Sequence, residues 1–168
     1  ELCRIENNNN CCLLTELAAA ICFNGTVEPA PGGGFNIRLA TENAAFARRV
    51  FSTIKKTCFI NPEISIRRSK KLKKHVSYVL LITHAAGSAK VLERTGVSVV
   101  PGGAGRDNDA GQHPVLVCGK KTPDKQCCRK AFLRGAFLAS GSISDPEKTY
   151  HLEVISRTRE QALHLTEM

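Results

Sequence analysis

The hydrophobic pattern of residues 11–23 predicts a helix that is buried on nearly all sides. The stretch CCLLTELAAAICF contains no glycine or proline and is apolar almost all round. Gly25 is expected to end this helix. A second stretch of the same character, CCRKAFLRGAFLAS at 127–140, is followed by Gly141. Each of the two predicted helices is therefore rich in small residues and closes with a neutral polar residue and a glycine.

Apolar positions along the chain predict further elements after the first helix. Residues 42–57 have apolar side chains at helical spacing and basic side chains on the other face, which predicts an amphipathic helix. A shorter helix is expected over 88–95, closed by Gly96. Strands with alternating apolar positions are expected at 26–28, 35–41, 63–68 and 76–83. The predicted order is helix, strand, strand, helix, strand, strand, helix.

The second apolar stretch opens a second copy of this arrangement. Thr122, Pro123 and Asp124 predict the cap and first turn of its helix. Thr158 with Gln161 predicts the cap of a later helix. The strand pair between the two helices is expected at 141–144 and 149–155.

The repetition covers a whole supersecondary unit, which predicts two related halves. The segment between them is rich in glycine and has no hydrophobic periodicity. The expected organisation is a first half at 1–96, a connecting segment at 97–122 and the start of a truncated second half at 123–168.

The composition adds a strong positive charge to this picture. Against 15 Asp and Glu stand 24 Lys and Arg, which gives a formal charge of +9. With 42% hydrophobic residues the chain is expected to fold, and a folded basic protein indicates an anionic partner, either nucleic acid or an anionic membrane surface. No apolar run approaches the roughly 20 residues of a spanning helix, and no signal-like segment precedes the fold. We therefore expect an internal piece of a cytosolic protein, with no membrane association.

The two helices carry segments that resemble one known motif. Aligned on their final glycines, LAAAICFNG at 17–25 and LRGAFLASG at 133–141 resemble the nine-residue LAGLIDADG motif of homing endonucleases. The resemblance implies an α+β fold of two pseudo-twofold-related αββαββα-type halves, with the motif helices side by side and a sheet that straddles duplex DNA. Small side chains would let the helix backbones approach closely, and Phe23 is a bulky departure. The residues expected at the helix interface are Ala19, Phe23, Gly135 and Ala139. Two unrelated core helices are the alternative.

A longer stretch resembles a more specific family. The segment CCRKAFLRGAFLASGSISDPEKTYHLEVIS at 127–156 is similar to the most recognisable part of the WhiA family of bacterial regulators. The resemblance implies a DNA-binding transcription factor that acts in sporulation, cell division and chromosome segregation, and that resides in the cytoplasm at the nucleoid. Family members join an endonuclease-like domain to a C-terminal helix-turn-helix domain. This chain is expected to hold the first domain without the second.

The motif ends argue against nuclease activity. Where the resembling endonucleases carry a pair of acids that hold divalent metal, this chain has Asn24 and Ser140. Two carboxylates at the negative ends of two helices require a cation between them, and neutral residues do not. We therefore expect no catalytic residues, catalytic metal or cofactor. A residual metal-dependent endonuclease is the alternative, although the nearest acids, Glu16, Glu28 and Asp145, form no evident pair.

Basic residues around a predicted hairpin indicate where duplex DNA would bind. The residues at this tip are Arg67, Arg68, Lys70, Lys71, Lys73 and Lys74. Arg38 and His151, with Glu153, alternate with apolar positions on other strands, so they are also expected to line the DNA groove. A solvated turn that protects a sheet edge is one alternative, and a scaffold that docks an acidic protein is another. Aromatic residues make up only 5% of the chain, which disfavours single-stranded nucleic acid.

The eight cysteines are expected to be reduced and mostly buried. Cys22 and Cys58 lie in apolar helix patterns, where a thiol behaves as a small hydrophobic group. If the motif helices lie side by side, two pairs of adjacent cysteines meet at their starts and could bind zinc. These cysteines are Cys11, Cys12, Cys127 and Cys128. Adjacent cysteines lack the spacing usual for zinc ligands, so buried thiols are the preferred interpretation and no metal is expected.

Overall fold

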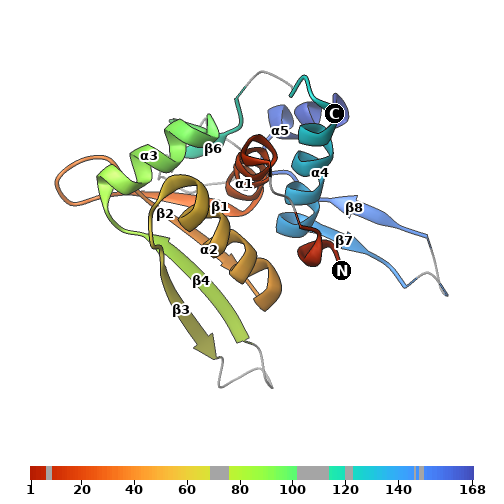
Figure 1. The fold of residues 1–168 in the computed structure, drawn as a ribbon, viewed down its shortest axis with the longest axis horizontal. Helices are drawn as coiled ribbons and strands as arrows, with labels where there is room; N and C mark the ends of the chain where they lie inside the picture. The colour runs from red at the N-terminus through yellow and green to blue at the C-terminus, as the bar shows by residue number, and fades with distance from the viewer. Residues whose placement is uncertain (7–8, 69–75, 102–113, 120–122, 146, 148–149) are drawn as a thin grey trace, which may run out of the picture.

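The chain folds as two copies of a helix followed by an antiparallel strand pair, and the first copy is the longer one (Figure 1). The computed structural model describes residues 1–6, 9–68, 76–101, 114–119, 123–145, 147 and 150–168. The first copy comprises η1 (Leu2–Arg4), α1 (Asn10–Asn24), β1 (Gly25–Pro29), β2 (Phe35–Thr41), α2 (Ala44–Cys58), β3 (Glu63–Arg68), β4 (Val76–Ile82) and α3 (Ala85–Thr95). After β5 (Ser98–Val100) and β6 (Val115–Val117) come α4 (Gln126–Ser140), β7 (Gly141–Ile143), β8 (Leu152–Val154) and α5 (Arg159–Thr166).

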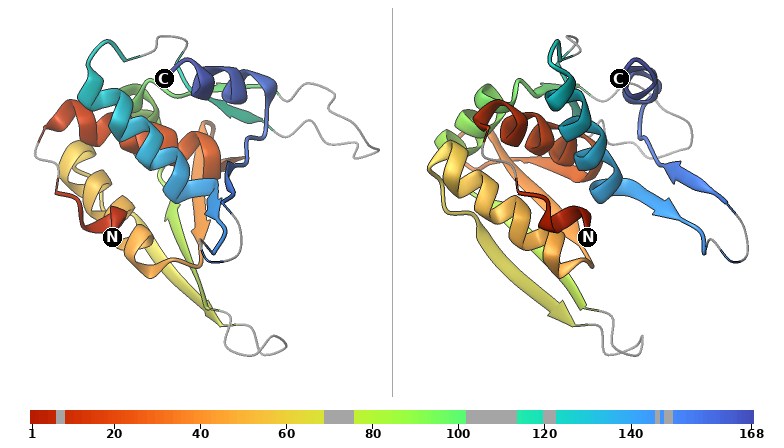
Figure 2. Two further views of the ribbon diagram at one scale, coloured as in Figure 1. Left: turned by 90° about the vertical axis from the view of Figure 1, so that its right-hand side faces the viewer. Right: turned by 45° about the vertical axis from the view of Figure 1, so that its right-hand side comes forward.

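The first copy forms an antiparallel sheet in the order β1-β2-β4-β3. Ile37 pairs with Ile82 and Leu39 with Leu80, and all four side chains are buried at 2% exposure or less. This apolar face packs against helices α1, α2 and α3, while the opposite face is left uncovered by them (Figure 2). The amphipathic pattern of α2 follows from this packing, since its buried stripe includes Phe46.

Helix α1 lies between the sheet and α4 (Figure 1). Because it is covered on nearly all sides, its apolar residues do not form a stripe; Ala19 and Ile21 are completely buried. Helices α1 and α4 run in the same direction, with Cys12 beside Cys128 at their starts and Asn24 bonded to α4 at its end. The two helices are called the motif helices from here on.

The predicted α+β fold and the predicted element order are confirmed. The strand pairs lie close to their predicted positions, and Thr158 caps α5 by accepting a hydrogen bond from the backbone N–H of Gln161. Short strands β5 and β6 pair across the glycine-rich segment. Gly96 closes α3 in the left-handed conformation, with φ of 67°.

Helix α2 begins at Ala44, two residues after its predicted start, and two other helix starts were wrong by three residues. Helix α3 begins at Ala85, earlier than position 88, because the backbone N–H of Ser88 already donates to the carbonyl of His84. Helix α4 begins only at Gln126, since Lys125 adopts the extended cap conformation, so Pro123 and Asp124 precede the helix. The predicted cap residue at position 122 lies outside the described residues.

Two of the cysteines that were expected to be reduced form a disulfide, so that prediction was wrong for this pair. Cys22 of α1 is joined to Cys118, which follows β6, with their Cα atoms 5.9 Å apart. The sequence pattern of α1 correctly predicted that Cys22 is buried, but it contains no information about a partner 96 residues away. Among the described residues, no helix is both long and apolar enough to cross a bilayer.

Candidate functional site

The C-terminal ends of the motif helices meet where the resembling endonucleases would place two acids. The side-chain amide of Asn24 donates from Nδ2 to the carbonyl of Ala139, 3.0 Å away, and its Oδ1 accepts from the backbone N–H of Ala40 at 3.2 Å. The Ser140 hydroxyl donates to the carbonyl of Ala136, one turn earlier, at 3.3 Å. Asn24 therefore connects the end of α4 to strand β2, which a carboxylate could not do because it has no proton to donate.

A guanidinium group binds the same end of α1. Arg157, which precedes α5, donates from Nη1 to the carbonyl of Gly25 and from Nη2 to that of Asn24, the latter at 3.2 Å. Burial lowers the pKa of Arg157, but a guanidinium remains charged in proteins. Positive charge is favourable at the C-terminal end of a helix. The protein thus places a fixed cation at the helix end near which a nuclease would bind a metal.

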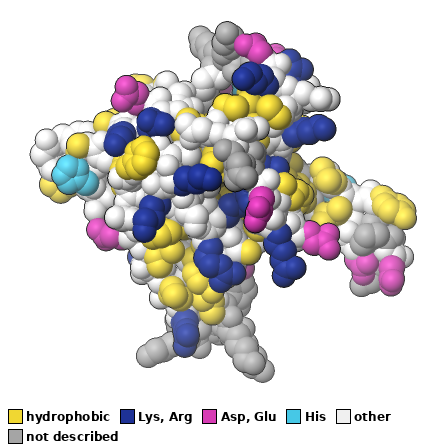
Figure 3. Space-filling model, in the orientation of Figure 1, with side chains coloured by type: hydrophobic (Ala, Val, Ile, Leu, Met, Phe, Trp, Pro, Cys, Tyr) yellow, Lys and Arg dark blue, Asp and Glu magenta, His cyan; other side chains and the backbone are white. Residues whose placement is uncertain are grey.

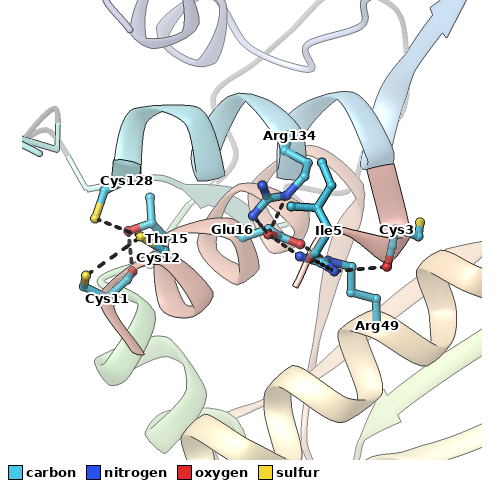
Figure 4. A network of polar contacts seen from close by, with 9 residues as sticks. All are labelled: Cys3, Ile5, Cys11, Cys12, Thr15, Glu16, Arg49, Cys128 and Arg134. Atoms are coloured by element: carbon cyan, nitrogen blue, oxygen red, sulfur yellow. Dashed lines mark hydrogen bonds and ion pairs between the residues drawn. The ribbon is translucent and has the colours of Figure 1, made fainter. Parts of the chain in front are cut away.

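Glu16 is the centre of an ion-pair cluster that joins three helices (Figure 4). This carboxylate lies in the middle of α1 and is only 5% exposed. Arg49 of α2 donates to both of its oxygens, with Nη2 2.9 Å from Oε2, and Arg134 of α4 donates to Oε2 with Nε at 2.9 Å. The hydrogen bonds to Glu16 raise the pKa of Arg49. Arg49 also donates to the carbonyls of Cys3 and Ile5, which attaches the N-terminal segment.

The motif helices approach most closely at Gly135. A Cβ atom at this position would lie 2.4 Å from the carbonyl oxygen of Glu16 and 3.0 Å from the Cβ of Ala19, so only glycine fits without displacement. Phe23 is buried and packs edge-on against Phe132 of α4, with ring centroids 6.2 Å apart. Ala139, the other residue expected at this interface, contributes its carbonyl to Asn24. The structure therefore brings all four expected interface residues to the helix pair.

The uncovered face of the sheet carries two of the arginines expected to contact DNA. Register places Arg38 opposite Leu81 and Arg67 opposite Ser77, so both arginines project from the face that the helices leave open. Arg68 pairs with Val76 and lies on the other face, although it is also exposed. The four lysines at the hairpin tip, Lys70, Lys71, Lys73 and Lys74, lie outside the described residues.

His151 and Glu153 contact each other on the second strand pair. His151 Nε2 lies 3.4 Å from Glu153 Oε2, and the Ser142 hydroxyl donates to Glu153 Oε1 at 2.8 Å. The hydrogen bond from Ser142 lowers the pKa of the Glu153 carboxyl most, and that from His151 lowers it further. Both His151 and Glu153 are exposed, so the contact leaves the imidazole accessible to a ligand.

Basic side chains are not confined to the open face of the sheet. The view in Figure 3, from the side of the helices, shows Lys and Arg side chains spread over α2, α3 and α4 with few acids among them. Three of those on α2, Arg48, Lys55 and Lys56, are exposed. Exposed positive charge is therefore also present on the helical side of the molecule.

Three cysteine sulfurs meet at the N-terminal ends of the motif helices (Figure 4). The Sγ atoms of Cys11, Cys12 and Cys128 all lie within 4.8 Å of one another, and Cys127 is exposed outside this group. A hydrogen bond from Cys128 lowers the pKa of the Cys11 thiol. Burial and the neighbouring thiols raise the pKa of Cys128 to about 12. The structure thus groups three of the four cysteines considered as zinc ligands.

Two functional residues were missed by sequence reasoning. Glu16 was noted only as a nearby acid, yet it is the one charged residue between positions 11 and 23, and a charge inside an all-round apolar helix signals a buried ion pair. Arg157 had no sequence signal, because its contact with the end of α1 spans 132 residues and depends on the packing of the second half.

Comparisons with known proteins agree on one family. A family model described as the WhiA N-terminal LAGLIDADG-like domain matches residues 10–98, and one described as the WhiA LAGLIDADG-like domain matches residues 129–168. The Probable cell division protein WhiA of Alkaliphilus metalliredigens is 42% identical over 160 residues, which cover 95% of this chain and 48% of that protein. Its counterpart from Ruminiclostridium cellulolyticum is 45% identical over 154 residues, which cover 92% of this chain and 45% of that protein. The chain spans about half the length of these relatives.

Solved structures show the same fold. The crystal structure of the N-terminal LAGLIDADG domain of DUF199/WhiA superposes with a TM-score of 0.68 at 18% identity, covering 99% of this chain and 68% of that chain. The crystal structure of full-length DUF199/WhiA from Thermatoga maritima gives a TM-score of 0.61 at 18% identity. This match covers 99% of the present chain and 46% of that chain. The family-model matches include α1, most of α4 and the strand pairs that follow them. The chain therefore belongs to the WhiA family, and two of its segments match that family's LAGLIDADG-like domains.

Proposed function

We propose that this chain is a duplex-DNA-binding domain of a bacterial transcriptional regulator and that it has no nuclease activity. The names of its relatives refer to cell division. In the proposed role, the protein regulates genes for cell division, sporulation and chromosome segregation, and it works in the cytoplasm at the nucleoid. The domain boundaries at 1–96, 97–122 and 123–168 belong to the same proposal, with DNA bound across both halves.

The observation that best supports the absence of nuclease activity is the bonding at the ends of the motif helices. Asn24 uses its amide to join α4 to β2, and Arg157 supplies a positive charge at the same helix end. A divalent ion there would meet no carboxylate from positions 24 and 140 and would be repelled by the guanidinium. Positions 24 and 140 therefore supply no carboxylate for the metal chemistry that cleaves a phosphodiester in the resembling enzymes.

The open face of the sheet is the proposed DNA surface. Arg38 and Arg67 project from it, and the tip of the β3–β4 hairpin adds four lysines in sequence. If about five cations meet phosphates, the log of affinity should fall with the log of salt concentration with a slope of roughly −4 to −5.

Fluorescence anisotropy with a labelled duplex over a series of salt concentrations tests the proposed surface. Replacing Arg38 and Arg67 by Glu should weaken binding and reduce the slope by about 1 per phosphate contact. The matched control is the double variant Lys55→Glu and Lys56→Glu, which makes the same charge change on α2, on the covered side of the sheet. An equal loss of duplex affinity in the control would refute this surface. Duplex affinity that does not change with salt concentration would refute phosphate recognition altogether.

A cleavage assay tests the second part of the proposal. The protein is incubated with supercoiled plasmid and Mg²⁺ or Mn²⁺, and no nicking is expected. Cleavage that EDTA abolishes, and that copurifies with the protein through successive columns, would restore the endonuclease alternative. An acidic protein that competes with DNA for Arg38 and Arg67 while duplex affinity alone stays weak would favour the docking scaffold instead.

A further inference from the structure

The three thiols at the start of the motif helices are held at distances suited to one metal ion. Cys12 and Cys128 Sγ are 3.8 Å apart, Cys11 and Cys12 Sγ are 4.0 Å apart, and all three sulfurs lie within 4.8 Å of one another. Two sulfurs bound at about 2.3 Å to a tetrahedral zinc ion are themselves about 3.8 Å apart. The spacing found here is therefore close to that of a zinc-thiolate site.

The same distances are unsuited to a disulfide. A disulfide requires its sulfurs about 2.05 Å apart, so Cys12 and Cys128 would have to move together by well over 1 Å at the starts of two packed helices. Three thiols would also leave one unpaired after any such oxidation. Geometry and number both favour a shared ion over a bond between two of the cysteines.

The starts of two helices meet at the three sulfurs. Cys11 and Cys12 lie in the first turn of α1, and Cys128 lies in the first turn of α4, so the positive ends of two helix dipoles converge on the three sulfurs. Cys12 and Cys128 are buried and Cys11 is exposed, so an ion held here would have protein ligands on one side and solvent on the other.

We propose that Cys11, Cys12 and Cys128 form a zinc site that ties the two halves of the protein together, with solvent as the fourth ligand. Adjacent cysteines on one helix are unusual ligands, but the contact with α4 brings both of their sulfurs to the side of Cys128. The ion would join α1 to α4 at one end, as Asn24 does at the other. This inference is independent of DNA binding.

Metal analysis of protein purified without chelator or affinity tag tests the site. The wild-type protein should bind about one zinc ion, and cobalt should replace it with the absorption band of thiolate-to-cobalt charge transfer. Loss of a supporting partner costs 10 to 100-fold in metal affinity, so removal of a direct ligand by Cys11→Ser should cost about 100-fold or more. Cys11 is exposed, and the far-ultraviolet circular dichroism of this variant should remain that of the wild type.

The matched control is Cys127→Ser, an exposed cysteine next to Cys128 but outside the group. This variant should retain the cobalt band and the rise in melting temperature on zinc addition, while Cys11→Ser should lose both. The proposal would be overturned if Cys11→Ser bound zinc as tightly as the wild type. It would also be overturned if Cys127→Ser lost as much zinc affinity as Cys11→Ser. A metal-free protein whose peptide map shows Cys12 bonded to Cys128 would overturn it in favour of a redox pair.

Discussion

Replacing Glu16 by Gln tests whether the ion-pair cluster holds the three helices together. The substitution keeps the size of the side chain but removes the charge that Arg49 and Arg134 both contact. The side chains of the two arginines are only 13% and 11% exposed, so neither guanidinium can turn fully into solvent without moving its helix. Two positive charges would then remain close together without an anion.

The magnitude follows from the burial of the cluster. Breaking a buried ion pair by removing one partner costs about 3–5 kcal/mol. Because Gln still offers one carbonyl oxygen to the arginines, we expect the lower end, about 3 kcal/mol, in the free energy of unfolding. For a chain of this length that corresponds to a melting temperature lower by roughly 6–12 °C.

Urea unfolding followed by circular dichroism measures this loss, and Glu28→Gln is the matched control. Glu28 is an exposed strand residue, so the same chemical change should alter stability by less than about 0.5 kcal/mol. Arg134→Met should cost less in the Glu16→Gln background than in the wild type, because its anion is already absent. A loss below about 1 kcal/mol for Glu16→Gln, or equal costs for Arg134→Met in both backgrounds, would refute the reasoning.

Three further predictions concern other contacts. Gly135→Ala should destabilise the protein by about 1–3 kcal/mol in urea unfolding, since a Cβ there would lie 2.4 Å from a carbonyl oxygen. The control Gly87→Ala in α3, where no atom would lie closer than 3.4 Å to the new Cβ, should be neutral or stabilising. Equal changes in stability for the two variants would contradict the close approach of the helices. Asn24→Asp should cost about 1–3 kcal/mol at neutral pH, because a carboxylate cannot donate to Ala139, and an unchanged urea midpoint would contradict that role. The pKa of Glu153, measured as its NMR titration midpoint, should lie below the ordinary glutamate value and rise in Ser142→Ala. The contribution of Glu153 to stability is complete above its unfolded pKa and is lost as the pH falls through its lowered folded pKa. A midpoint that Ser142→Ala leaves unchanged would contradict the hydrogen bond from Ser142 as the cause of the lowered pKa.

The fold was largely predictable because its signals are local. The all-round apolar pattern of α1, the alternation of β2 and the caps at Gly96 and Thr158 are each set by neighbouring residues, and the structure has these elements at or near their predicted positions. The start of α4 was predicted wrongly because a proline and an acid are compatible with both a first helical turn and the residues that precede it.

The site was less predictable because its contacts join distant segments. The pairing of Cys22 with Cys118, the bond from Arg157 to α1 and the exclusion of Cys127 from the thiol group depend on which helix faces meet. A charged residue in an apolar helix, such as Glu16, indicates that an oppositely charged partner exists but does not identify that partner. Sequence alone indicated which residue types were unusual, and only the packing of α4 against α1 showed what they contact.

The close contact of the motif helices has a consequence for the synthesis of the protein. Bonds between α1 and α4 connect residues 115 to 118 positions apart. A ribosome adds about 5–20 residues per second, so α1 waits on the order of ten seconds before its partner emerges. During that interval the small-residue surface around Ala19 and the carboxylate of Glu16 lack the contacts that α4 provides. The first half can therefore complete its packing only after α4 has emerged, and until then the surface of α1 that α4 covers is open to aggregation and to proteases.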